Sequence, residues 1–245
     1  MPTVAELTAL YGNFMLGPRP GPDVCGVCFN LTDGYGRCYA CAHGGLWLDA
    51  VAPISYSVAG EQLHYALAGY KRLSGPVAHR FGVELAAVLW RYLASHERCL
   101  AQATAVDSFE LVTTVPSSDR DRDESHPLRQ LVGEFVGPTR DRHRRLLRRT
   151  DTRTDARAFS VDKYNCPTDL SGRSVLLVDD TWTSGANAQS AAAALRAAGA
   201  GPVAAVVIGR HVNRGWRQND NLIRRLTQPF DWNLCGLCGL QNPMI

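Results

Sequence analysis

Apolar residues recur along the chain with two different periods, and each period predicts one type of element. Over residues 77–99 they lie three or four positions apart, which predicts a helix with one buried face: Phe81, Leu85, Val88, Leu89, Tyr92 and Leu93. Short apolar or alternating runs predict strands over residues 54–58, 109–115, 174–178 and 203–208. Strands that alternate with helices favour a parallel sheet, so we expect an α/β fold whose sheet is flanked by helices.

Weaker patterns complete the series of elements. Residues 4–16 have apolar positions at helical spacing and predict a short amphipathic helix, and residues 128–136 also suit a helix. An alanine-rich helix over residues 186–198 is expected to end at Gly199, because glycine favours the C-terminal cap. Residues 62–67 fit either a strand or a turn of helix.

These patterns divide the chain into three parts. Residues 1–50 contain the first helix, a Gly/Pro stretch and four closely spaced cysteines; residues 51–230 form the α/β domain; residues 231–245 are a tail with a further cysteine pair. A chain of 245 residues can bury one full core, with room for a small appendage.

Charge is spread unevenly along the chain. The formal net charge of +3 gives no whole-chain argument for nucleic-acid binding. One segment, 140–157, is nonetheless rich in arginine: Arg140, Arg142, Arg144, Arg145, Arg148, Arg149, Arg153 and Arg157. This segment could form a flap over an anionic substrate, contact nucleic acid, or remain a solvated helix face.

Nothing in the sequence predicts a membrane span or a secretory signal. The chain has no run of about twenty apolar residues, and its first residues lack a basic region followed by an apolar one. We therefore expect a cytoplasmic protein, in which thiols stay reduced. Its eight cysteines then indicate metal binding before disulfide formation.

Two closely spaced cysteine pairs predict a zinc site. Cys25 and Cys28 form one C-x-x-C pair, and Cys38 and Cys41 form another, with nine residues between the pairs. Each C-x-x-C turn directs two thiolates to one point, so two turns complete a tetrahedral site of four cysteines. Four protein ligands leave no position for water, which predicts a structural zinc ion.

The remaining cysteines leave alternatives open. Cys235 and Cys238 form a third C-x-x-C pair, which could dock beside the first two pairs, replace one of them as a zinc ligand, or be a redox-labile pair. Cys99 and Cys166 stand alone and are interpreted as small buried residues.

The stretch that begins at Val175 carries the most specific chemistry. A buried strand leads into Asp179 and Asp180, then into Thr183, Ser184 and Gly185 before the alanine-rich helix. Ligands of open α/β sheets lie at the carboxyl ends of strands, and helix N-termini bind phosphate. Carboxylates beside a phosphate-binding turn therefore predict a sugar-phosphate site. The alternative is an ordinary strand–helix junction with solvent-facing acids.

This stretch resembles the 5-phosphoribosyl-1-diphosphate (PRPP) signature of type I phosphoribosyltransferases. Ser184 and Asn187 stand where that signature has threonine. Together with the cysteine pairs, Tyr70 and Lys71, and the Val115–Pro116 loop, it resembles the ComF-like branch of that family. The chain departs from the family over residues 123–130, where an Arg-Gly-Phe-Asn-Gln motif is usual; the acceptor and the activity itself therefore stay open.

The resemblance implies a magnesium-dependent transfer of the phosphoribosyl group to an unidentified nucleophile, with release of diphosphate. Asp179 and Asp180 would bind the ribose hydroxyls, directly or through magnesium. The implied contacts to the 5-phosphate come from Thr181, Thr183, Ser184, Gly185, Ala186 and Asn187. The implied contacts to the diphosphate come from Pro116, Ser117, Ser118, Lys71, Arg120 and Arg122. Asp179, Asp180 and Lys71 are the implied catalytic residues.

Other interpretations stay open at this point. The chain could instead be a non-catalytic PRPP sensor, or a protein that binds nucleic acid or a partner and is linked to DNA uptake, as the ComF resemblance implies. His126 could act as a base or be an ordinary loop residue, and Trp182 could stack on an acceptor or pack against the sheet. Acceptor-selecting residues are expected before Tyr70 or in the tail, and a homodimer is one alternative for assembly.

Overall fold

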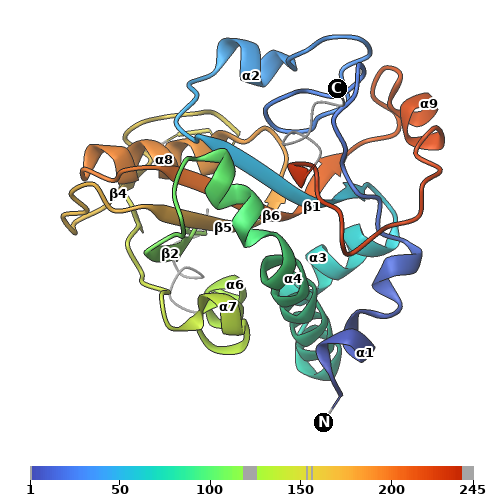
Figure 1. Cartoon of the computed structure of the whole chain (residues 1–245), viewed down its shortest axis with the longest axis horizontal. Helices are drawn as coiled ribbons and strands as arrows, with labels where there is room; N and C mark the ends of the chain where they lie inside the picture. Colours follow the sequence, from blue (N-terminus) through green and yellow to red (C-terminus); the bar gives the residue numbers. More distant parts are fainter. Residues whose placement is uncertain (1, 118–125, 153, 156, 239–245) are drawn as a thin grey trace.

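The computed structural model describes residues 2–117, 126–152, 154–155 and 157–238. Its centre is a four-stranded parallel sheet in the order β1-β6-β5-β2 (Figure 1). The strands are β1 (Ala50–Val58), β2 (Leu111–Thr114), β5 (Val175–Trp182) and β6 (Val203–Val212). The predicted α/β fold with a parallel sheet is therefore confirmed. Both β5 and β6 run four residues beyond their predicted ends, so Asp179 and Asp180 lie within β5.

Alternation along β5 divides its side chains between two cores. Leu176 and Val178 belong to the core on one face of the sheet, and Val175 and Leu177 belong to the core on the other. Because both faces are covered, the strand is apolar at every position up to Val178. The same alternation places the next two side chains, both carboxylates, on opposite faces of the sheet.

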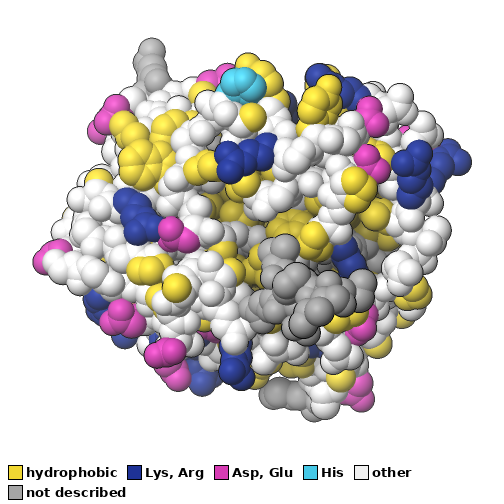
Figure 2. Space-filling view, turned by 45° about the horizontal axis from the view of Figure 1, so that its top comes forward, with side chains coloured by type: hydrophobic (Ala, Val, Ile, Leu, Met, Phe, Trp, Pro, Cys, Tyr) yellow, Lys and Arg dark blue, Asp and Glu magenta, His cyan; other side chains and the backbone are white. Residues whose placement is uncertain are grey.

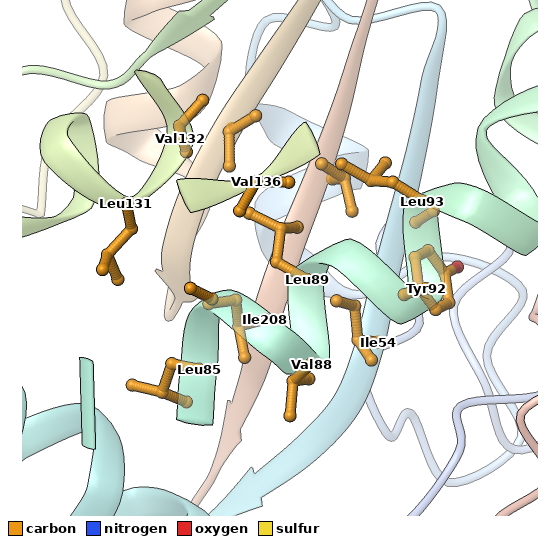
Figure 3. Packing of buried hydrophobic residues seen from close by; sticks show 14 of the residues in the cluster. Ile54, Leu85, Val88, Leu89, Tyr92, Leu93, Leu131, Val132, Val136 and Ile208 are labelled. Carbon is orange, nitrogen blue, oxygen red and sulfur yellow. The ribbon is translucent and has the colours of Figure 1, made fainter. Parts of the chain in front are cut away.

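One face of the sheet is covered by α3 (Gln62–Arg72) and α4 (Gly75–Ala103). The apolar stripe of α4 points toward β1 and β6, as Figure 3 shows for Leu89 and its neighbours beside Ile54 and Ile208. This confirms the helix predicted over residues 77–99. Residues 62–67, which fitted two alternatives, are helical and form the first part of α3.

The opposite face is covered by α8 (Ala186–Ala197) (Figure 1). Its alanines allow the helix to lie close to the sheet, and Ala191 and Ala192 are fully buried there. The helix ends before Gly199, which adopts a left-handed φ of 87°, as its predicted role as a cap requires.

Shorter elements complete the described chain. They are α1 (Val4–Thr8), η1 (Tyr11–Asn13), α2 (Tyr39–His43), α6 (Pro127–Gln130), η2 (Leu131–Phe135), α7 (Gly137–Arg140), β3 (Arg148–Arg149), β4 (Tyr164–Asn165) and α9 (Asn219–Arg224). The first predicted helix is thus correct at its start but divides into α1 and η1. The helix predicted over 128–136 divides into α6 and the π-helical turn η2.

Helices in the described part of the chain are too short or too polar to cross a membrane. The longest of them, α4, has 29 residues, but its outer face carries exposed charged side chains such as Arg80 and Arg98. This amphipathic pattern fits a helix that packs on a sheet with one face and meets solvent with the other.

Replacing Leu89 by alanine tests how strongly α4 holds the sheet. Leu89 is 1% exposed, so Leu89→Ala should lower the free energy of unfolding by about 3 kcal/mol through lost burial and a residual cavity. Leu10→Ala is the matched control, because Leu10 is 72% exposed and its loss should change stability by about 0.5 kcal/mol or less. Denaturant unfolding of both variants measures the difference, and equal losses would contradict this packing role for α4.

Candidate functional site

A cavity of about 670 Å³ opens at the carboxyl ends of the sheet strands. Its walls come from α3, from the loop after β2, from the end of β5 and from the start of α8. The predicted site residues that line it are Lys71, Pro116, Ser117, Asp179, Asp180, Thr181, Thr183 and Asn187. His126, the predicted candidate base, lines it too, together with Arg72, Arg157, His64 and His211. The predicted phosphate-binding residues Ser184, Gly185 and Ala186 do not line it. Ser118, Arg120 and Arg122 lie outside the described residues.

Asp180 faces α3 and is held by two of its side chains. The Lys71 ammonium donates a hydrogen bond to Asp180 Oδ1 at 2.6 Å, and the Tyr70 hydroxyl donates to Oδ2. Asp180 is only 2% exposed. Burial by itself would raise its pKa, but the charge of Lys71 and the hydrogen bonds from Lys71 and Tyr70 outweigh burial and lower the pKa. The carboxylate therefore stays ionised.

Asp179 faces the other side of the sheet and has a different environment. Its Oδ1 accepts a hydrogen bond from the backbone amide of Asp180 at 2.9 Å. Burial raises the pKa of Asp179 to about 7, and the neighbouring Asp180 charge contributes to the rise against the weaker pull of Lys71. Two adjacent carboxyl groups with pKa values pushed in opposite directions can perform different tasks in one site.

The turn after β5, residues 183–185, lies at the carboxyl end of that strand, and its Thr183 lines the cavity. Within the described chain, the amides of Thr183, Ser184 and Gly185 donate no hydrogen bond. Gly185 has a left-handed φ of 83° and caps α8, whose N-terminus adds a partial positive charge. Unpaired amides at a helix N-terminus form a site suited to an anion.

The Trp182 ring packs against Gly185 of this turn. Its ring is 2% exposed, and a Cβ atom on Gly185 would overlap it. Of the two alternatives for Trp182, packing within the protein is therefore correct, and the ring does not line the cavity.

The sequence did not reveal the contribution of Lys163, which is fully buried beside α8. Its ammonium donates hydrogen bonds to Asn187 Oδ1 at 3.1 Å and to the carbonyl oxygens of Asp155 and Ala158 at 3.2 Å and 2.7 Å. Burial lowers the pKa of Lys163. Through these bonds Lys163 orients Asn187 and fixes the loop that carries Arg157 to the cavity wall.

Arg210 on β6 was also missed, although it joins two regions of the chain. It is 3% exposed, and its Nε donates to the carbonyl oxygen of Cys28 at 3.2 Å. One terminal nitrogen donates to the carbonyl oxygens of Trp182 at 3.0 Å and Thr183 at 2.9 Å. The guanidinium therefore ties the cysteine-rich segment to the turn beside the cavity.

The four N-terminal cysteines converge as their spacing predicted. The Sγ atoms of Cys25, Cys28, Cys38 and Cys41 all lie within 4.8 Å of one another, and all four residues are buried. We call these residues the four-cysteine group. Four converging buried thiols without disulfides are a donor set that could hold zinc, and the Arg210 side chain, 3.9 Å from Cys28 Sγ, would offset their negative charge.

The third cysteine pair does not replace either pair of the four-cysteine group. Cys235 and Cys238 lie instead with His96 and Cys99 of α4, and the donor atoms of these four residues are also within 4.8 Å of one another. Cys99 is therefore more than a small buried residue. Cys166 stays isolated from both groups and donates to the carbonyl oxygen of Thr168 at 3.4 Å. Both Cys99 and Cys166 are half-buried, so the interpretation of the two as buried residues is wrong.

The arginine-rich segment 140–157 is not a single solvated helix face. Arg142 forms a two-pronged ion pair with Glu97, at 2.6 Å and 2.8 Å, and so anchors the segment to α4. Leu146 and Leu147 are buried, and β3 pairs with β4. Arg153 lies outside the described residues. On the face in Figure 2, the described Lys and Arg side chains are scattered among acidic ones.

No family model matches the chain, and no curated protein or solved structure matches it either. The resemblance to phosphoribosyltransferases therefore stays a prediction from the sequence motifs.

Replacing Arg210 by methionine should uncouple the two regions that it joins. Arg210→Met leaves buried carbonyl groups without a donor, so we expect the free energy of unfolding to fall by about 3 kcal/mol. Arg173→Met is the control, because Arg173 pairs with Glu110 at the surface and its removal should cost less than about 1 kcal/mol. Denaturant unfolding in the presence of zinc measures both, and a loss no larger for Arg210→Met would contradict the role.

Ionisation of Asp179 should reduce stability as the pH rises. Its folded pKa of about 7 lies above the ordinary value, so the stability present at low pH is lost as pH increases through 7. Asp179→Asn removes this loss, and its gain in unfolding free energy should be about 1 kcal/mol larger at pH 8 than at pH 5.5. Asp107→Asn, at an exposed position, is the control and should change the free energy of unfolding by about 0.5 kcal/mol or less. A constant difference for Asp179→Asn would contradict the raised pKa.

Proposed function

We propose that this protein binds PRPP together with magnesium and transfers the 5-phosphoribosyl group to a nucleophile, releasing diphosphate. The observation that carries the proposal is the meeting of three features at one cavity: the Asp179–Asp180 pair, the loop after β2 and Thr183, the first residue of the turn before α8. The amides of this turn donate no hydrogen bond within the described chain. A phosphorylated pentose with a second anionic group has one chemical group to contact each of these three features: hydroxyls, a phosphate and the second anion.

The arrangement suggests an orientation for the substrate. The 5-phosphate would accept hydrogen bonds from the amides of the turn 183–185, where the N-terminus of α8 favours negative charge. The ribose hydroxyls would meet Asp179, and the diphosphate would extend toward the Pro116 loop. Lys71, Arg72 and Arg157 supply positive charge along the same cavity.

Magnesium fits the donor set in a limited way. This ion is usually bound by one or two carboxylates together with substrate phosphates and water, and Asp179 provides such a carboxylate once it is ionised. When bound, magnesium would supply positive charge that stabilises the departing diphosphate. The contribution of the protein is to hold the ribose and the leaving group in place and to stabilise charge that develops in the transition state.

Lys71 and Asp180 neutralise each other in the structure, which favours a second candidate function. A diphosphate would have to compete with Asp180 for the Lys71 ammonium, because the two are paired at 2.6 Å. If the pair persists with ligand bound, Lys71 is withdrawn from catalysis, and the protein would sense PRPP without turning it over. Nucleic-acid contact through the segment 140–157 stays a prediction.

Titration calorimetry with PRPP and magnesium tests the proposal. The wild-type protein should bind, and Asp179→Asn should weaken binding about tenfold or more, because a charged contact to the ribose or its metal is lost. Asp107→Asn is the matched control and should bind like the wild type. Absence of binding by the folded wild-type protein would refute both candidate functions.

Release of diphosphate separates the transferase from the sensor. The protein would be incubated with PRPP, magnesium and a panel of purine and pyrimidine bases and small amines. Release that depends on one acceptor and is lost in Asp179→Asn supports transfer. Tight binding without release under any condition in the panel supports the sensor.

A further inference from the structure

We propose that His96, Cys99, Cys235 and Cys238 form a second zinc site, which fastens the C-terminal tail to helix α4. Sequence spacing pairs only Cys235 with Cys238. The fold brings the other two residues to them from a helix more than a hundred positions earlier. The inference is independent of the proposed function, because none of these four residues lines the cavity of the candidate site.

The distances between donor atoms match a tetrahedral metal site. Cys238 Sγ lies 3.3 Å from Cys235 Sγ, 3.6 Å from Cys99 Sγ and 3.5 Å from His96 Nδ1, and Cys99 Sγ lies 3.9 Å from that nitrogen. Zinc bound tetrahedrally by sulfur and nitrogen places neighbouring ligand atoms about 3.5–3.8 Å apart. A disulfide would need about 2.05 Å. The four ligands of an iron–sulfur cluster would be more widely spread, because they are divided over two or four iron atoms.

The histidine is oriented for the role. His96 is 3% exposed, and its Nε2 lies 2.9 Å from the carbonyl oxygen of Trp232. A carbonyl oxygen can only accept, so Nε2 carries the proton and Nδ1 has a lone pair directed at the three sulfur atoms. A backbone carbonyl that fixes the tautomer in this way is a regular partner of metal-binding histidines.

The helix and the tail each contribute a pair with suitable local geometry. His96 and Cys99 are three residues apart on α4, which places them on one face of the helix. In the tail, the backbone amide of Cys235 donates a hydrogen bond to Cys238 Sγ at 3.3 Å. Backbone donors of this kind stabilise a thiolate, the form in which cysteine binds zinc.

The tail needs such a fastening because it has little regular structure of its own. It approaches α4 through Trp232, whose ring lies 4.4 Å from the guanidinium carbon of Arg91. Further along the tail, Gly236 lies against the ring of Phe29. Phe29 directly follows Cys28 of the four-cysteine group. The second site thus holds the tail between α4 and the segment of the four-cysteine group.

Zinc stoichiometry tests the proposal. Metal-free full-length protein, reduced and then titrated with zinc against a chromophoric chelator, should bind two ions per chain. The double variant Cys235→Ser with Cys238→Ser should bind one, and the control Cys166→Ser should bind two. His96→Cys keeps four ligands and should also bind two, whereas His96→Ala should bind its second ion much more weakly. One ion in the wild type, or two in the double variant, would overturn the proposal.

X-ray absorption on the zinc-loaded wild-type protein gives a result that no folding defect of a variant can obscure. Two sites with these ligands contain seven sulfur atoms and one nitrogen around two ions. A spectrum with a histidine contribution supports the second site, and a pure sulfur shell overturns it. So does a Cys235–Cys238 disulfide in the mass spectrum of protein purified under reducing conditions, because oxidised sulfur atoms cannot bind zinc in this way.

Discussion

The buried guanidinium of Arg210 is the interaction through which the separate parts of this protein depend on one another. A charge that is 3% exposed is tolerated only when hydrogen bonds replace its lost hydration, and here backbone carbonyls supply them. One of these carbonyls belongs to Cys28, and the others belong to the turn after β5. The segment that carries the four-cysteine group is therefore linked through Arg210 to the turn beside the cavity.

A second constraint is the alternation of β5. The strand continues past its apolar part, so Asp179 and Asp180 point to opposite faces and acquire opposite shifts in pKa. Asp180 meets Tyr70 and Lys71 on the α3 side and stays charged. Asp179 meets no cation as close among the described residues and titrates near neutral pH. The difference in pKa between these two carboxyl groups therefore follows from the alternation of side chains along β5.

The sequence predicted those features of the fold and of the metal-binding groups that depend on a local pattern of residues. The apolar run 175–178, the stripe of the helix over residues 77–99 and the two N-terminal C-x-x-C pairs each contain their own signal, and the structure has all of them. Contacts across long separations left no such signal: Lys163 reaches Asn187 over 24 residues, and Arg210 reaches Cys28 over 182. His96 was missed for the same reason, because its partners lie in the tail. Strand ends were misplaced where polar residues continue a strand, as at Asp179.

The close packing of Gly185 on Trp182 has a consequence for how this protein can evolve. A methyl group at position 185 would overlap the indole ring, and the left-handed backbone there already disfavours other residues. A homologue with a side chain at this position would need a much smaller residue in place of the tryptophan. Positions 182 and 185 should therefore change together in descendants of a common ancestor, as a coupled pair of substitutions rather than two separate ones.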